Sequence, residues 1–226
     1  MSSLALMRWL ESAPSRYDAG MNAVTLGRVA RLHDAVAKAA AEVPARAEGS
    51  GAPRVLEIGC GTGAVTERLL RSGLDVTAID ESPEMIEQCA ARTDGCGPGR
   101  LVLVEQTAAE IDGFDAESFD AVVLSLVLSD MSAGERRFVL DQAGRVLVAG
   151  GRLIVADETV PGGAVARTLY RLARGPQAAA AWLLAGSVSR AVAELGRLVA
   201  EAGFTMLHSE HWLGHSLELV VAEKER

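Results

Sequence analysis

Three glycines stand within five residues, Gly59-Cys60-Gly61-Thr62-Gly63, directly after a short apolar run. Glycine tolerates positive φ and, having no Cβ, lets another group approach the backbone closely. A helix that follows such a turn offers N–H groups without intrahelical partners to the polar atoms of a ligand. The stretch therefore predicts a strand-to-helix turn that binds a small polar molecule. A tight turn without any ligand is the alternative.

One carboxylate can extend this site. Asp80 ends the apolar run 76–79, and a carboxylate at a strand end can accept hydrogen bonds from both hydroxyls of a ribose. A helix cap or a solvated strand end is the alternative for Asp80 taken alone. The segment Gly59-x-Gly61-x-x-Ala64 also satisfies the dinucleotide fingerprint G-x-G-x-x-G/A. The turn therefore predicts a nucleoside cofactor, and by itself leaves S-adenosylmethionine (AdoMet) and NAD as alternatives.

The elements that must position these residues alternate along the chain. Apolar runs typical of strands are found at 54–58, 76–79, 101–104, 121–128 and 152–156. Helical patterns lie between them at 64–72, from Pro83 onward, and at 135–147, where Gly150-Gly151 is expected to stop the helix. The run 121–128 is apolar throughout, as is typical of a strand buried on both faces. This alternation predicts a mostly parallel sheet with helices on both sides.

The two ends of the chain follow other patterns. A helix is expected from about Asn22 to Glu42, and 190–202 predicts another helix. Residues 205–212 and 216–221, joined by a turn at Leu213-Gly214, predict an antiparallel pair at the sheet edge. We expect a single domain that comprises an N-terminal helical cap (1–43), a cofactor-binding core (54–158), a helical insertion on the acceptor side (160–189), and a C-terminal helix and hairpin (190–224).

Composition excludes several classes of protein. The formal net charge of −8 over 226 residues repels a phosphate backbone, so no nucleic-acid partner is expected. The three cysteines are odd in number and form no CxxC pair, so we expect neither a disulfide framework nor a metal site. This cysteine usage is typical of a protein in a reducing compartment. The longest apolar stretch, Ala178–Gly186, is too short to span a bilayer, and the N-terminus is a poor secretory signal. We therefore expect a cytoplasmic protein without a membrane partner.

The motifs together resemble a known family. The segments VLEIGCGTG (55–63) and VTAIDESPEMIEQC (76–89) resemble the AdoMet-binding signature of class I methyltransferases. FDAVVLSLVLSDM (119–131) and AGRVLVAGGRLIVAD (143–157) resemble the family's fourth strand and its turn into the fifth, and 202–224 resembles its last helix and hairpin. The resemblance implies a Rossmann-like α/β fold: a mostly parallel seven-stranded sheet with an antiparallel C-terminal hairpin and helices on both faces. It implies AdoMet rather than NAD, because that hairpin is not expected in a dinucleotide dehydrogenase.

Family roles carry over position by position. The glycines of the turn and Glu57 would hold the amino-acid end of AdoMet, Asp80 its ribose, and Ser82 and Met85 its adenine. The implied cofactor-binding residues are Tyr17, Glu57, Gly59, Gly61, Gly63, Asp80, Ser82, Met85, Thr107, Ala108 and Ser125. Thr107-Ala108 stands where the family often carries Asp-Ala, so the Thr107 hydroxyl or the Gln106 amide would have to replace the carboxylate at the adenine.

Two finer resemblances concern partners. The segment APSRYDAGMNAVTLGR (13–28), which contains Tyr17, is similar to the entry segment of ubiquinone/menaquinone-type methyltransferases. Together with ADETVPGG (156–163) it resembles a subset encoded beside corrinoid proteins. The resemblance thus implies a small-molecule methyl acceptor, and leaves a homodimer and a corrinoid protein as further partners.

Methyl transfer from a sulfonium is a direct displacement that needs alignment rather than a protein nucleophile. Asp130 follows the fourth strand at the edge where ligands of such sheets gather, and is the first candidate on the acceptor side. Ser129, Asp157 and Glu158 are similarly placed. His211 is a second candidate base. A NAD-binding oxidoreductase and a non-catalytic AdoMet-binding protein associated with a corrinoid protein are the alternative functions.

Overall fold

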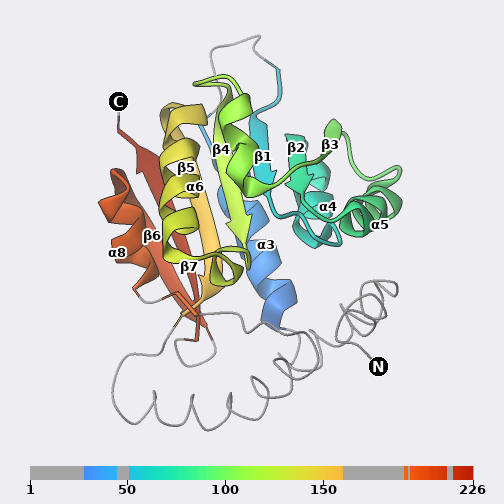
Figure 1. Ribbon diagram of the computed structural model, residues 1–226. Coiled ribbons are helices and arrows are strands. Elements are labelled where there is room, and N and C mark those ends of the chain that lie inside the picture. The colour runs from blue at the N-terminus through green and yellow to red at the C-terminus, as the bar shows by residue number, and fades with distance from the viewer. Residues whose placement is uncertain (1–27, 45–50, 160–190, 193, 213–215, 226) are drawn as a thin grey trace, which may run out of the picture.

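The computed structural model describes residues 28–44, 51–159, 191–192, 194–212 and 216–225. Its strands form one seven-stranded sheet in the order β3-β2-β1-β4-β5-β7-β6 (Figure 1). The strands are β1 (Arg54–Ile58), β2 (Asp75–Asp80), β3 (Leu101–Glu105), β4 (Phe119–Ser125), β5 (Leu147–Glu158), β6 (Phe204–Trp212) and β7 (Leu217–Lys224). Strands β1 to β5 are parallel, while β7 runs antiparallel to β5 and β6 antiparallel to β7. The expected fold class is confirmed.

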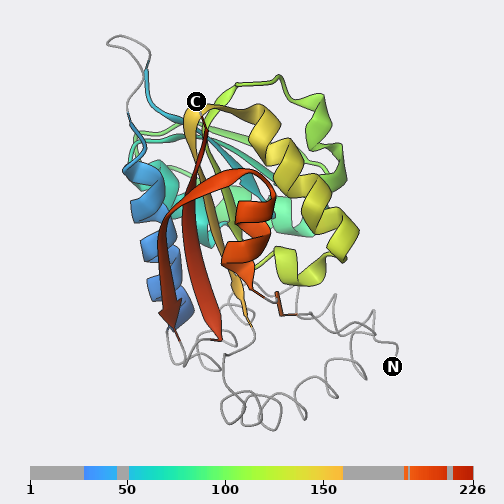
Figure 2. The same ribbon diagram turned by 90° about the vertical axis from the view of Figure 1, so that its left-hand side faces the viewer.

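Helices cover both faces of this sheet. One face carries α3 (Arg28–Ala41), α4 (Ala64–Arg71) and α5 (Pro83–Thr93), whose buried side chains share one apolar cluster. The other face carries α6 (Ala133–Val146) and α8 (Leu195–Glu201), which share a second cluster. Figure 2 shows α3 on the opposite side of the sheet from α6 and α8.

The apolar residues 121–124 of strand β4 are buried on both faces of the sheet. Ala121 and Val123 belong to the cluster on the α3 side, whereas Val122 and Leu124 belong to the cluster on the α6 side. Successive side chains of a strand point to opposite faces, and both faces are covered here, so residues 119–124 are all buried and only Ser125 at the end of the strand is partly exposed. The strand order also reverses between β1 and β4, which creates a crevice at the carboxyl ends of these strands.

Three boundaries differ from the sequence prediction. Strand β4 ends at Ser125 rather than at residue 128, because Leu126 adopts φ 58°, which extended backbone does not allow. Helix α6 begins at Ala133, since Ser132 and Glu135 form a capping box. It ends at Val146 because the chain enters β5 at Leu147; the expectation that Gly150-Gly151 stops the helix was wrong, since both glycines lie within that strand.

Some of the remaining sequence predictions concern residues that the structure describes, and others concern residues outside that part of the chain. Helix α3 occupies the described part of the helix expected from Asn22 to Glu42. The helix expected over 190–202 starts only at Leu195, and Val192 forms an isolated bridge with Thr159 instead. Tyr17, the turn at Leu213-Gly214 and the insertion 160–189 lie outside the described residues. Among the described helices, none combines the length and apolar character that a bilayer crossing requires.

We expect the substitution Leu124→Ala to lower the free energy of unfolding by about 2–5 kcal/mol, because it removes buried methyl groups and leaves a cavity. Leu124 is fully buried in the central strand. Leu207→Ala on β6 is the matched control, since that leucine is 49% exposed and its loss should cost about 0.5 kcal/mol or less. Urea denaturation measures both, and similar losses for the two variants would contradict the assignment of the core.

Candidate functional site

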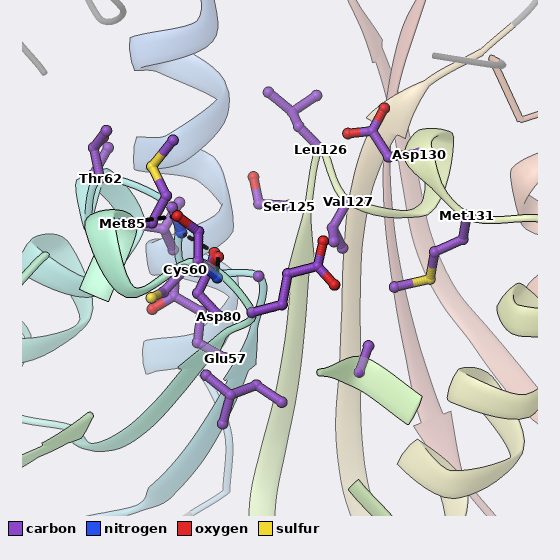
Figure 3. Close-up of a pocket in the computed structure, with 18 of the residues that line it drawn as sticks. Glu57, Cys60, Thr62, Asp80, Met85, Ser125, Leu126, Val127, Asp130 and Met131 are labelled. Carbon is purple, nitrogen blue, oxygen red and sulfur yellow. Dashed lines mark hydrogen bonds between the residues drawn. The ribbon is translucent and has the colours of Figure 1, made fainter. Parts of the chain in front are cut away.

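A cavity of about 1060 Å³ opens at the carboxyl ends of β1, β2 and β4 (Figure 3). Its wall combines the glycine turn with two 3₁₀ helices, η1 (Ala108–Gly113) and η2 (Leu128–Asp130), and with parts of α3 and α6. Sites for a single small ligand usually measure about 300–1,000 Å³, so this cavity has room for a cofactor and a second molecule. The predicted site residues that line it are Glu57, Gly59, Gly61, Asp80, Ser82, Met85, Thr107, Ala108, Ser125 and Asp130.

The three glycines of the turn all have positive φ, and they differ in what a Cβ at each position would meet. A Cβ on Gly59 (φ 73°) would lie 2.6 Å from Cγ2 of Val127, and a Cβ on Gly63 (φ 79°) would lie 2.7 Å from the sulfur of Cys89. A Cβ on Gly61 (φ 52°) would meet no described atom within 4 Å. Gly59 and Gly63 therefore make room for other side chains of the protein. Gly59 and Gly61 both line the cavity, and of the three glycines Gly61 is the one with open space where a Cβ would lie.

The carboxylate of Asp80 is fixed beside that open backbone. One oxygen, Oδ2, accepts a hydrogen bond of 2.8 Å from the N–H of Gly61, and Oδ1 accepts one of 3.0 Å from the N–H of Ser82. Each carboxylate oxygen has a further lone pair that can accept a ligand hydroxyl. The hydroxyl of Ser82 caps α5 by accepting from the N–H of Met85 at 3.3 Å, as expected from the sequence. This cap begins the helix beside the cavity.

Glu57 lies beneath the turn and is almost fully buried, with 2% of its surface exposed. Its Oε2 accepts a hydrogen bond of 2.6 Å from the hydroxyl of Thr66 on α4. Burial raises the pKa of Glu57 from 4.5 to about 8, because one hydrogen bond offsets only part of the cost of desolvating the charge. The carboxyl is therefore neutral at pH 7 in the protein alone, and a cation entering the cavity would favour its ionised form.

One polar atom at the cavity has no partner. The Oγ of Ser125, at the end of β4, is buried and makes no hydrogen bond to any described residue. Its side chain points into the cavity (Figure 3). Buried hydroxyls without partners are rare in folded proteins, and a ligand polar atom is one way to satisfy them. Ser125 therefore marks a point where a ligand can donate or accept a hydrogen bond.

The side chains expected to replace the missing aspartate are engaged elsewhere. Thr107 caps η1 in a capping box with Glu110, and the amide of Gln106 donates to the carbonyl of Glu110 at 2.7 Å. Both residues still line the cavity. Their structural task is to begin η1 and so to place Ala108 at the cavity wall.

The two candidates for acid–base chemistry lie on different elements, and one of them lines the cavity. Asp130 is exposed and lines the cavity at the end of η2. His211 lies on the edge strand β6, with its Nε2 at 4.0 Å from Oε1 of Glu218, and does not belong to the described cavity wall. Sequence reasoning also missed His33 of α3 and Arg68 of α4, which do line the cavity. Only the packing of these helices brings them there, and no local motif marks them.

The strand order, the glycine turn and the strand-end carboxylate together define a Rossmann-like nucleoside-binding fold of the class I methyltransferase type. Residues 55–151 match the family model described as a methyltransferase domain. This part of the chain is therefore a methyltransferase domain.

Curated relatives are similar over this same region. The chain is 35% identical over 119 residues to a demethylmenaquinone methyltransferase from Clavibacter sepedonicus, an alignment that covers 53% of this chain and 46% of the relative. It is 37% identical over 112 residues to a ubiquinone biosynthesis O-methyltransferase from Xylella fastidiosa, covering 47% of this chain and 42% of the relative. The chain thus spans about half the length of the curated relatives it matches.

Solved structures are similar over most of the chain. The N-methyltransferase NodS from Bradyrhizobium japonicum, in complex with S-adenosyl-L-homocysteine, gives a TM-score of 0.63 at 20% identity and covers 88% of each chain. A putative methyltransferase from Bacillus halodurans gives 0.65 at 16% identity, covering 84% of this chain and 99% of the other. At such identities the similarity establishes a shared fold.

We expect the buried carboxyl of Glu57 to make stability depend on pH. Its pKa is raised from 4.5 to about 8 in the folded protein, so the folded state holds a proton that the unfolded chain has lost between these values. Its contribution to stability is fully present below about pH 4.5 and is lost as the pH rises through about 8. The free energy of unfolding of the wild type should therefore fall over this range relative to that of Glu57→Gln, whose amide does not titrate.

Urea denaturation at several pH values measures this difference, and Glu87→Gln, an exposed position on α5, serves as the control. A difference between the wild type and Glu57→Gln that stays constant with pH would show that Glu57 is ionised in the folded protein.

Proposed function

We propose that this protein transfers a methyl group from AdoMet to a small-molecule acceptor by direct displacement. One observation carries the proposal: the backbone of Gly61 is open to the cavity, and its N–H fixes the carboxylate of Asp80 at 2.8 Å. A nucleoside can lie against that backbone while the carboxylate accepts its ribose hydroxyls. The methyltransferase family match over 55–151 supports AdoMet as the nucleoside.

The other residues of the cavity fit this cofactor. The buried carboxyl of Glu57 can bind the ammonium group of AdoMet. The hydroxyl of Ser125, which has no hydrogen-bond partner among the described residues, can bind the methionine portion of AdoMet. Met85 and Ala108 border the space for the adenine, together with Ser82. Because the carboxyl of Glu57 is neutral in the protein alone, binding of the cationic cofactor should release its proton. Tyr17 remains our proposal for a contact from the N-terminal segment.

The cofactor supplies an activated methyl group on a sulfonium, and the chain supplies alignment. On the acceptor side the cavity is walled by Leu126, Met131 and Phe138, the last of which is 37% exposed. Asp130 is the carboxylate on this side and is our proposal for a base if the acceptor must lose a proton. His211 can act as the base only if the bound acceptor extends as far as β6.

The relatives suggest the class of acceptor to test first. Two of them carry the names demethylmenaquinone methyltransferase and ubiquinone biosynthesis O-methyltransferase, so hydroxylated aromatic compounds head the panel. A homodimer and a corrinoid protein are further proposed partners. The free cysteines Cys60, Cys89 and Cys96 support a cytoplasmic location. The proposed domain division places the insertion 160–189 on the acceptor side.

A non-catalytic AdoMet-binding protein is the second candidate function. It is favoured by the absence of the adenine carboxylate at Thr107, whose hydroxyl donates to the carboxylate of Glu110. Release of S-adenosyl-L-homocysteine (SAH) from AdoMet across the acceptor panel separates the two functions. Binding without any turnover would favour the non-catalytic protein.

We expect Asp80→Ala to weaken SAH binding by at least about tenfold, which corresponds to about 1.4 kcal/mol, because the ribose loses a charge-assisted partner. Isothermal titration calorimetry measures the affinity, with the exposed Asp94→Ala at the end of α5 as the control. Failure of the wild type to bind AdoMet or SAH would refute the proposed function. Unchanged affinity in Asp80→Ala would refute the ribose contact alone.

Substitutions of Gly61 and Gly63 should affect different properties: the first SAH affinity, and the second the stability of the fold. Gly61→Ala places a methyl group in the open cavity, so we expect an SAH affinity lower by about tenfold or more and a stability loss of only about 1–2 kcal/mol from the left-handed backbone. Gly63→Ala carries the same backbone strain and also collides with Cys89, so it should unfold at clearly lower urea concentration. Equal stability losses, or unchanged SAH affinity in Gly61→Ala, would contradict the division of roles.

A further inference from the structure

The connection between β4 and α6 forms the part of the cavity wall that faces the glycine turn. Leu126, Val127, Asp130 and Met131 all line the cavity from this connection (Figure 3). Val127 packs directly on the backbone of Gly59, where a Cβ would lie 2.6 Å from its Cγ2. We call residues 126–131 the β4–α6 wall. Its position relative to the glycine turn fixes the space between the proposed cofactor and acceptor.

The wall is tied to β5 at its start by the N–H of Leu126, which donates to the carbonyl of Ala156 at 2.7 Å, and its later residues make few backbone bonds. Leu126 adopts the left-handed conformation (φ 58°), which costs a residue with a Cβ about 1–2 kcal/mol. Within the wall, the N–H of Asp130 donates to Val127 and that of Met131 to Leu128, at 3.2 and 3.1 Å. A strained residue and one short turn do not define a single geometry, so contacts from neighbouring elements must impose it.

Asp157 at the end of β5 holds the wall from the sheet side. This carboxylate is fully buried, and its Oδ2 accepts hydrogen bonds from the N–H groups of Leu128 and Ser129 at 2.7 and 3.2 Å. Its Oδ1 accepts from the N–H of Glu158 at 2.7 Å, and the hydroxyl of Ser129 adds a further bond. Burial raises the pKa of Asp157 to about 6, so the group is ionised at neutral pH and these bonds are charge-assisted.

Arg136 on α6 holds the same two residues from the opposite side. Its Nε donates to the carbonyl of Leu128 at 2.6 Å, and its guanidinium donates to the carbonyl of Ser129 at 3.4 Å. The N–H groups of Leu128 and Ser129 are thus bound by an anion, and their carbonyls by a cation. Two opposite charges on two different elements fix one pair of residues in the middle of the wall.

We propose that Asp157 and Arg136 are positioning residues for methyl transfer, which hold the β4–α6 wall against the glycine turn so that the acceptor is aligned with the methyl group. The proposal rests on the proposed function. Asp157 does not act as a base, because its carboxylate is fully buried and directed at backbone N–H groups rather than at the cavity. A misplaced wall should reduce turnover more than cofactor binding, because Gly61 and Asp80 belong to other elements.

The test uses Asp157→Asn, with Asp120→Asn as the matched control. Asp120 is also a buried aspartate (2% exposed) that accepts from a backbone N–H, that of Arg54 at 2.7 Å, but it lies at the amino end of β4. The measurements are amide hydrogen exchange at residues 128 and 129, SAH affinity by calorimetry, and kcat and KM with the panel acceptor that gives the highest rate.

For Asp157→Asn we expect exchange at 128 and 129 to rise by about tenfold or more, and kcat to fall by a similar factor. The SAH affinity and the KM for AdoMet should stay within about threefold. Asp120→Asn should leave exchange at these two residues unchanged. If Asp157→Asn does not fold, Arg136→Lys tests the hold on the carbonyls of the same two residues with the buried carboxylate in place, and the same changes in exchange and kcat are expected.

Unchanged exchange at 128 and 129 would overturn the proposal, and so would an unchanged kcat when exchange has risen. A kcat that falls equally in Asp120→Asn would also overturn it, because both losses would then reflect general destabilisation. If the wild type methylates no acceptor of the panel, the proposed function fails, and the exchange measurement by itself decides whether Asp157 holds the wall.

Discussion

The hydrogen bond from the N–H of Gly61 to the carboxylate of Asp80 is the interaction on which the rest of the site depends. It joins the end of β1 to the end of β2 and orients a charged group beside an exposed stretch of backbone. A carboxylate bound in this way cannot rotate away from the cavity, so a ligand finds its hydrogen-bond acceptors already in place. Such preorganisation lowers the entropy that binding must overcome.

The sheet supplies the frame for this junction. Strands β1 and β4 are neighbours although β2 and β3 lie between them in sequence, and the chain turns to opposite sides of the sheet after each. Both faces are covered, so the central strands are rigid and the irregular backbone is confined to their carboxyl ends. Leu126 and the three glycines of the turn adopt positive φ there. The site is thus a set of irregular connections held by a regular core, and of these four residues Leu126 is the one that bears backbone strain.

Local patterns in the sequence predicted most elements. The Ser82 cap and the Pro83 start of α5 were read correctly because both act within four residues. The start of α6 was predicted too late, although Ser132 and Glu135 form a capping box that the sequence already contains. The end of β4 was also predicted too late, because an apolar run does not reveal where φ becomes positive. Candidate residues near the cavity were found when they end a strand, as Asp80 does. His33 was missed because it lies in the middle of a helix.

The sequence by itself determined the order of elements, the fold class, the glycine turn and the strand-end carboxylate, because strand and helix periodicity and turn chemistry depend on near neighbours. Only the tertiary structure decided which glycine has open space beside it, since Val127 and Cys89 reach Gly59 and Gly63 from other elements. It also decided that Asp157 binds backbone N–H groups, whereas Asp130 faces the cavity. These outcomes depend on which strands and helices lie side by side in space. The spacing of residues along the sequence does not reveal how close two elements come in the fold.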